Sequence, residues 1–530
     1  MSPFLSDKYG SKNLVNDNPI EWHMRRTALI SAVEDTVILT DELAEQHNKA
    51  LRSFVREYNG SGQALLALPS EERPAKFPKY LQEIEEEGVH QYFMEFALEE
   101  VQIKKSIAIL KALDDFASAS FNYFLDGYYV HKQNTLTVSP NYPPRYILKT
   151  LLDQLAYDLS IVQRAVDQRR RRADGHTTTQ GHALLLADQL ATLALQPAKT
   201  GGYLDENVSI LTHLDQNVRV RLIPYAHTLI VSLAFASVSE KDKPSRDYLA
   251  LAHEVGHHLY WNGRVPNTTD SLKAALEDEI AADKNIPPWC KHWVEEIFAD
   301  AYALIVGGPV IALDFQDMLD DDVPGHFRKD TDKHPIPEIR PLIQTEILRQ
   351  IKDKKNKPTS LYKGAPDLLD TLWAEWLDNV VATQTYTPRN AGNSLTGQKI
   401  IAGLKPLINI ILDLLSDARP ANETIPWSKD FTQRKEIKLL YDLQIPSSEV
   451  ENKQRMLRYF RNDGSNLNRL AKFLNDLNLD EIVQPITFQD HLDSIEAERG
   501  GQLSSKRWIQ HFLTHGWSIE GPMGSSIGRD

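Results

Sequence analysis

The sequence is almost free of cysteine, because Cys290 is the only one among 530 residues. A lone cysteine can form neither an intrachain disulfide nor a zinc site built from several thiolates. This excludes the small disulfide-stapled scaffolds that are typical of secreted domains. It also favours a reducing compartment.

Long apolar runs are missing as well. The segment Met1–Asn18 is polar and lacks the apolar core of a signal peptide. No apolar run reaches the roughly 20 residues that a membrane-spanning helix needs. We therefore expect a cytoplasmic protein without a membrane span, and export by a machine that reads no signal peptide stays open.

Positive charge is in deficit. The chain has 59 Lys and Arg residues against 73 Asp and Glu residues, which gives a formal net charge of -14. Nucleic-acid binding needs clustered Lys and Arg to neutralise phosphates, so we expect no nucleic-acid partner. The one basic run, Arg169–Arg172, is interpreted as a solvated helix end.

What remains is an ordinary globular composition, with 42% hydrophobic and 25% charged residues, in a chain long enough for two or three domains. Helical spacing of apolar residues covers most of residues 22–172 and resumes after 335. Short β-branched runs between 208 and 235 predict strands. The pattern predicts an α+β, predominantly helical fold with a small β-sheet. We divide it into an N-terminal helical region over 1–199, a central domain over 200–345 and a C-terminal helical region over 346–530, with linkers at 352–360 and 384–396.

The central domain contains the motif His-Glu-x-x-His at residues 253–257. A helix is predicted over 245–260, ended by Asn262-Gly263. His253 and His257 are four residues apart and therefore share one helix face, so both imidazoles can bind one ion. Zinc suits such ligands, and the adjacent Glu254 can take a proton from a water on the metal.

A catalytic zinc also needs a third protein ligand, which we sought on a second helix. The segment 293–304 is helical in pattern and places Glu296 and Asp300 on one face. Glu296 can then reach the metal while Asp300 orients a ligand imidazole. Glu295 is expected to point elsewhere. Other acids could replace Glu296 on spacing alone: Glu277, Asp278, Glu279 and Asp283.

The two motifs together resemble those of the gluzincin metallopeptidases, in which His-Glu-x-x-His is followed at variable distance by Glu-x-x-x-Asp. The resemblance covers residues 253–300. It implies a zincin-like catalytic domain over 200–345 that holds Zn²⁺ through His253, His257 and Glu296. It also implies that Glu254 is the catalytic base and that Asp300 supports a ligand histidine.

Rival zinc-peptidase patterns do not fit. Metzincins need Gly at position 260 and His at position 263, where this chain has Tyr260 and Gly263. Aspzincins use an aspartate after a Gly-Thr pair, and no such pair precedes Asp300. The Gly-x-Met-Glu-Asn signature of aminopeptidases is also missing, which favours an endopeptidase.

Peptide hydrolysis needs a donor for the oxyanion of the tetrahedral intermediate. The segment 332–340 contains His-Pro-x-x-x-x-Arg and resembles the segment that follows the glutamate ligand in membrane-associated and related soluble gluzincins. His334 or Arg340 would then be the donor, with Tyr302 and His326 as weaker candidates. Alternatively, the segment is a Pro-fixed loop in which Arg340 forms a structural ion pair.

The strand predicted over 227–235 directly precedes the motif helix, where gluzincins place an edge strand that aligns the substrate backbone. It is nearly continuous in apolar residues, so a buried strand is an equal alternative.

The sequence thus predicts a zinc-dependent peptidase, most simply an endopeptidase, that acts on a peptide or protein substrate. The flanking helical regions could dock a regulatory protein partner. The alternative is a helical scaffold or toxin-like binding protein with a structural or inactive zinc site. The intact Glu254 favours the enzyme.

Overall fold

The computed structural model describes residues 19–57, 87–122, 145–173, 177–205, 207–216, 219–223, 226–235, 250–319, 327–331, 333–351, 365–377 and 379–418. Several predictions lie outside these residues. They include the linker at 352–360, the start of the motif helix near Ser245, the candidate donor His326 and all helices beyond 418.

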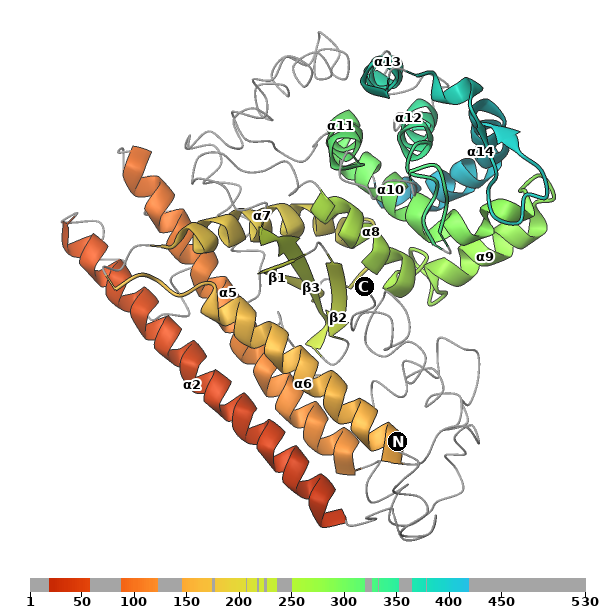
Figure 1. Cartoon of the computed structure of the whole chain (residues 1–530). Coiled ribbons are helices and arrows are strands. Elements are labelled where there is room, and N and C mark those ends of the chain that lie inside the picture. Colours follow the sequence, from red (N-terminus) through yellow and green to blue (C-terminus); the bar gives the residue numbers. More distant parts are fainter. Residues whose placement is uncertain are drawn as a thin grey trace.

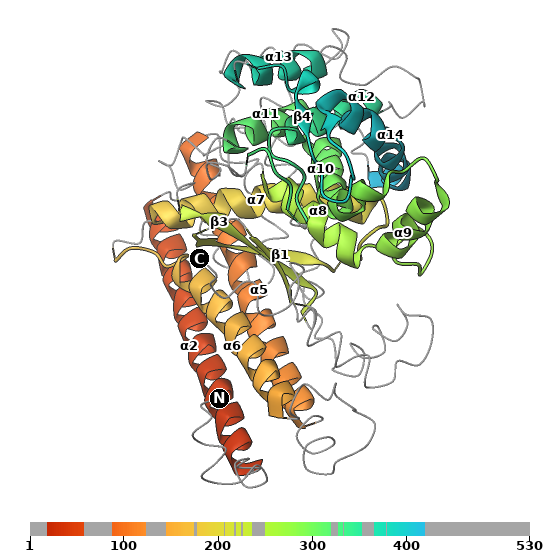
Figure 2. The same ribbon diagram turned by 45° about the vertical axis from the view of Figure 1, so that its right-hand side comes forward.

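The N-terminal region is a bundle of long helices, as the helical spacing predicts. Helices α2 (Pro19–Glu57), α5 (Glu87–Asn122) and α6 (Arg145–Asp167) run side by side (Figures 1 and 2). Their apolar faces meet in one core that contains Val33, Phe116 and Leu155. Burial of these faces is what stabilises such long helices in water.

A three-stranded sheet follows the bundle in the chain. Its order is β1-β3-β2, with β1 (Ser209–Asp215) parallel and β2 (Arg219–Ile223) antiparallel to β3 (Thr228–Ala234). The three predicted strands are confirmed. The interpretation of the strand over 227–235 as an edge strand is wrong, because β3 is hydrogen-bonded on both sides and offers no edge to a substrate.

Both faces of the sheet are buried. Side chains alternate along each strand, so Ile210 and Leu214 of β1 enter one core while Leu211 enters the other. Helix α6 packs against β1 on one face and α7 (Thr179–Thr200) on the other. The sheet therefore separates the helical bundle from the part of the fold that carries the motifs (Figure 1).

Arg169 joins these layers, which corrects its interpretation as part of a solvated helix end. Its side chain is 6% exposed, and its guanidinium donates to both carboxylate oxygens of Asp188 on α7, at 3.0 and 2.8 Å. It also donates to the carbonyl oxygen of Thr212 on β1, at 2.8 Å. A buried charge needs such a partner, and this ion pair links α6, the sheet and α7.

The remaining helices form one continuous core with α7 that runs from Ala183 to Ala418. It therefore runs across both predicted domain boundaries, at 199 and 345, which stay predictions. The predicted linker at 384–396 instead contains a small hairpin of β4 (Thr385–Tyr386) and β5 (Leu395–Thr396) that buries Tyr386. The helices are α8 (Ala250–Asn262), α9 (Leu272–Ala282), η6 (Pro288–Trp293), α10 (Val294–Gly307), α11 (Pro309–Met318), α12 (Arg340–Gln350), α13 (Ala365–Leu377) and α14 (Gly397–Leu414).

The described part of the chain is thus mostly helical with small sheets, in agreement with the predicted α+β, predominantly helical class. None of its helices combines the length and the apolar character that crossing a membrane requires.

Candidate metal centre

Helices α8 and α10 lie against each other at an unusually short distance, and this contact brings the two motifs together. At Gly256 of α8, a Cβ atom would lie 2.7 Å from Cα and 2.9 Å from the carbonyl oxygen of Ala299 on α10. Only glycine allows the backbones to approach so closely. The side chains that flank Gly256 and Ala299 on the two helices therefore meet across the contact.

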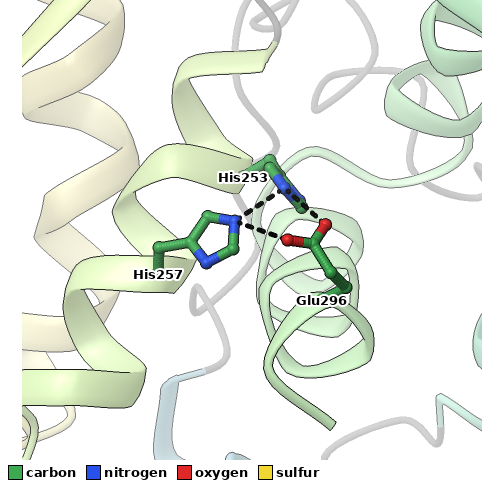
Figure 3. Close-up of side chains that lie close together, drawn as sticks. All are labelled: His253, His257 and Glu296. Carbon is green, nitrogen blue, oxygen red and sulfur yellow. Dashed lines mark hydrogen bonds and ion pairs between the residues drawn. The ribbon is translucent and has the colours of Figure 1, made fainter. Parts of the chain in front are cut away.

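His253 and His257 extend from α8 towards Glu296 of α10 (Figure 3). The two Nε2 atoms are 3.0 Å apart. Glu296 Oε1 lies 3.4 Å from His257 Nε2, and Glu296 Oε2 lies 3.6 Å from His253 Nε2. A tetrahedral ion with bonds of about 2.0–2.2 Å separates its ligand atoms by about 3.3–3.6 Å. The three side chains could therefore hold one metal ion.

The three groups are buried, and their charges act strongly on one another. Burial alone would lower the pKa of His253, but contacts with Asp300 and Glu296 outweigh it and raise this pKa to about 9. Burial would likewise raise the pKa of Glu296, but His257 and Arg340 hold it well below the ordinary range. These shifts favour a protonated imidazole beside an ionised carboxylate. A divalent cation that binds here would compete with that proton.

Asp300 supports His253 from behind. Its Oδ1 atom lies 2.9 Å from His253 Nδ1, a short ion-pair distance at an angle that is poor for a hydrogen bond. Arg340, the first residue of α12, donates through Nε and Nη2 to the two oxygens of Asp300, each at 2.9 Å. Its Nη2 is also 2.9 Å from Glu296 Oε2. Arg340 thereby fixes the two carboxylates relative to each other.

Glu295 supports His257 in the same way, and the expectation that it points elsewhere is wrong. Its Oε1 atom is 3.1 Å from His257 Nδ1 and accepts a hydrogen bond from Trp261 Nε1 at 2.8 Å. The motif pattern contains no position for this residue. A signal was available, because each imidazole exposes a second nitrogen that also needs a partner.

Glu254 differs from the other carboxylates of the site. Glu295, Glu296 and Asp300 are all paired, whereas Glu254 forms no hydrogen bond or ion pair with any of the residues that the structure describes. It is nevertheless buried, with 9% of its surface exposed. It lies near enough to His257 and Arg340 for its negative charge to favour the protonated form of both. Its oxygens are therefore available to a bound molecule.

His334 lies at the open side of the cluster. Its Nε2 atom is 3.4 Å from Glu296 Oε1, and its side chain is 54% exposed. The protein around the half-exposed ring lowers its pKa by partial desolvation; Glu296 opposes this shift, and Arg340, His257 and His253 add to it. His334 stands beside the three-residue group without belonging to it.

Tyr302 is not brought to the site. It is fully buried in α10, and its hydroxyl donates to the carbonyl oxygen of Ala194 on α7 at 2.6 Å. Since Tyr302 is two residues beyond Asp300, it extends from a different helix face. Tyr302 therefore does not face the candidate metal centre, which corrects its prediction as an oxyanion donor.

The comparisons with known proteins add nothing to this geometry. No protein-family model, curated protein or solved structure matches the chain.

Proposed function

We propose that this protein is a zinc-dependent endopeptidase of the gluzincin type. The observation that carries the proposal is the buried group of His253, His257 and Glu296 beside a carboxylate, Glu254, that has no partner in the described part of the chain. A purely structural metal site is closed by protein ligands and needs no such group. A hydrolytic site needs both an open position and a base.

The donor set favours zinc. Two imidazoles and one carboxylate form the ligand set of many catalytic zinc sites, whereas magnesium and calcium prefer oxygen ligands alone. When bound, zinc acts as a Lewis acid and lowers the pKa of a water molecule that it holds.

The surrounding residues have distinct tasks in this proposal. Glu254 accepts the proton of the attacking water and returns it to the leaving amine. Asp300 and Glu295 each hold Nδ1 of one ligand histidine, so that both Nε2 atoms face the same point. Such support keeps the ligands preorganised, so that little reorganisation is needed during the reaction.

His334 is the better oxyanion donor of the two candidates that reach the site. Arg340 is buried, and its Nε and Nη2 groups are already bound to Asp300 and Glu296. His334 Nε2 is at the exposed side, where a substrate carbonyl can approach. We therefore assign Arg340 to holding the carboxylates and His334 to stabilising the developing negative charge.

The decisive experiment compares wild type with Glu254→Gln. We expect about one zinc ion per chain in both proteins by elemental analysis, because Glu254 is not a ligand. Cleavage of an unbiased peptide library should fall at least a hundredfold, roughly the scale for loss of a general base.

A double variant, His253→Ala with His257→Ala, is the metal control and should lose the zinc. Retention of full zinc by the folded double variant would place the metal elsewhere. Equal cleavage rates for wild type and Glu254→Gln would contradict the mechanism. Zinc binding without cleavage of any peptide would favour the alternative of a binding protein with an inactive site.

A further inference from the structure

The loop that carries His334 is folded around one hydroxyl group. Thr331 Oγ1 accepts hydrogen bonds from the backbone N–H of His334 at 2.9 Å and from that of Lys333 at 3.3 Å. The backbone N–H of Thr331 donates to the carbonyl oxygen of His334 at 3.1 Å, which closes the turn. The same Oγ1 atom lies 3.1 Å from Nδ1 of the His334 ring.

The hydrogen bonds of the Thr331 hydroxyl determine which nitrogen of the His334 ring carries the proton. A threonine oxygen has two acceptor lone pairs and one hydrogen to donate. The two backbone N–H groups occupy both lone pairs. The remaining contact, to His334 Nδ1, is therefore made by the hydroxyl hydrogen. Nδ1 must then be the acceptor, and the ring proton of the neutral imidazole belongs on Nε2.

We infer that Thr331 is a positioning residue that fixes the Nε2–H tautomer of His334 and so presents a donor to the metal centre. The Nε2 atom is the one that faces Glu296 Oε1, at 3.4 Å. The opposite tautomer would aim a lone pair at that oxygen and could not donate to an oxyanion. An oxyanion donor is useful only if its proton is in place before charge develops.

The loop itself is anchored from two other directions. Asp330, which precedes Thr331, accepts a hydrogen bond from the backbone N–H of Arg389 at 3.0 Å and lies 2.9 Å from His292 Nε2. His292 belongs to η6, which leads directly into α10, and Arg389 lies between β4 and β5. The position of Thr331 is thus tied to the helix that carries Glu296.

The first test observes the tautomer without relying on activity. Full-length protein labelled with ¹⁵N-histidine is studied at pH 8.5 in the zinc-free form, where an ordinary imidazole, with a pKa of about 6.5, is neutral. Two-bond ¹⁵N–¹H correlation spectra distinguish Nε2–H from Nδ1–H, and the signals lost in His334→Gln identify this ring. We expect the Nε2–H form in wild type and in Thr331→Ser, and a mixture of both forms in Thr331→Val.

A matched control removes a similar turn hydroxyl in another loop, the one between α8 and α9. Thr268 Oγ1 donates to the Val265 carbonyl oxygen at 2.9 Å and accepts from the backbone N–H of Asp270 at 3.1 Å. Thr268→Val should leave the His334 signals unchanged. Because Thr331 is exposed, loss of its hydroxyl should not unfold the chain. Wild-type protein in the Nδ1–H form, or a tautomer unchanged in Thr331→Val, would overturn the inference.

The second test rests on the proposed function. Thr331→Val should lower kcat by roughly two- to tenfold, the scale of one net hydrogen bond, while KM and zinc content stay as in wild type. Thr331→Ser should restore kcat. Equal kcat values in the Val and Ser variants would overturn the positioning role. If wild type cleaves no peptide, the proposed function fails, and the tautomer spectra still decide this inference.

Discussion

At the residue scale, His253 and His257 present Nε2 to each other because the Nδ1 atom of each is held by a carboxylate. Asp300 holds one ring and Glu295 the other, so each ligand has its own support. The two supports differ in charge balance. Asp300 is shared with the guanidinium of Arg340, whereas Glu295 is shared with the neutral indole of Trp261.

The Asp300 contact gives a testable pH dependence of zinc binding. Asp300 helps to raise the pKa of His253 to about 9, so below this pH zinc must displace a proton from His253. In Asp300→Asn the raised pKa falls, and less proton displacement is needed. At pH 9 we expect zinc affinity to drop roughly 10- to 100-fold through loss of orientation. The ratio of wild-type to variant zinc affinity should become smaller as the pH is lowered towards 6.5. Competition with a chelator measures both affinities.

The control for this prediction is Asp278→Asn, on the exposed side of α9. It removes a charge of the same sign and should leave zinc affinity unchanged at every pH. If the ratio of wild-type to Asp300→Asn zinc affinity stays constant from pH 6.5 to pH 9, Asp300 does not set the protonation of His253. Unchanged affinity throughout would assign Asp300 to packing alone.

At this scale the sequence predicts much of the candidate site. His253, His257, Glu296 and Asp300 meet because helical spacing places each pair on one face. The sequence does not predict the role of Glu295, since adjacent positions on a helix face different directions and only the partner helix shows that both are used. The two-residue spacing from Asp300 already turns Tyr302 away from the site, but only the fold shows that it faces α7.

At the element scale, the site depends on the close contact of α8 and α10 at Gly256. Glycine in a helix interior costs about 1 kcal/mol relative to alanine, so Gly256→Ala should stabilise α8 if only propensity mattered. The added Cβ would lie 2.7 Å from Ala299 Cα, which is backbone and cannot rotate away. We therefore expect a net destabilisation of about 1–3 kcal/mol and weaker zinc binding, because the helices must separate.

Gly403→Ala on α14 is the matched control for this variant. A Cβ there would lie 3.2 and 3.3 Å from side-chain atoms of Trp289 and Pro287, which have more room to adjust than backbone. Thermal unfolding and chelator competition should show a smaller effect, with zinc affinity as in wild type. A Gly256→Ala protein that is more stable and binds zinc normally would mean that the contact does not position the ligands.

The elements themselves could be predicted from the sequence where their period is strong, as for α2, α6 and α14. The order of the strands could not. β3 looks like a buried strand or an edge strand from its composition, and only pairing with both β1 and β2 makes it central. The hairpin in 384–396 was also missed, because strands of two residues leave no periodic signal.

At the scale of the whole molecule, two apolar cores share one small sheet. Leu211 and Ile230 belong to the core of the N-terminal bundle, while Ile210 and Val231 belong to the core around the candidate metal centre. The sequence predicts helical regions on both sides of a sheet. It does not predict that Arg169 links them, because a run of four arginines indicates a solvated surface until Asp188 is placed opposite.

The shared sheet also contains a buried titratable group. His213 on β1 lies on the same face as Leu211 and is 3% exposed, and no residue that the structure describes forms a well-aligned hydrogen bond with either of its side-chain nitrogens. Burial lowers its pKa to about 4, with Asp215 opposing the shift and Arg164 and Arg169 adding to it. The fold therefore favours the neutral ring over the charged one.

The sign of the resulting pH dependence follows from the two pKa values. The unfolded chain takes up a proton near the ordinary histidine pKa of about 6.5, whereas the folded chain does so near 4. The contribution of His213 to stability is therefore complete above 6.5 and is lost as the pH falls from 6.5 towards 4. Between pH 7 and pH 5 the loss is on the order of 2 kcal/mol.

His213→Leu, which fills a similar volume without titrating, tests this prediction. Urea unfolding of the zinc-free protein is measured at pH 7 and pH 5 for both chains, because acid would also release a bound metal. Wild type should lose about 2 kcal/mol more than the variant over this interval. Part of the acid sensitivity should persist in the variant, since burial also lowers the pKa of His258 to about 4. Equal losses in the two proteins would mean that His213 reaches water before it is protonated, and that the sheet is less well sealed between its two cores than this structure indicates.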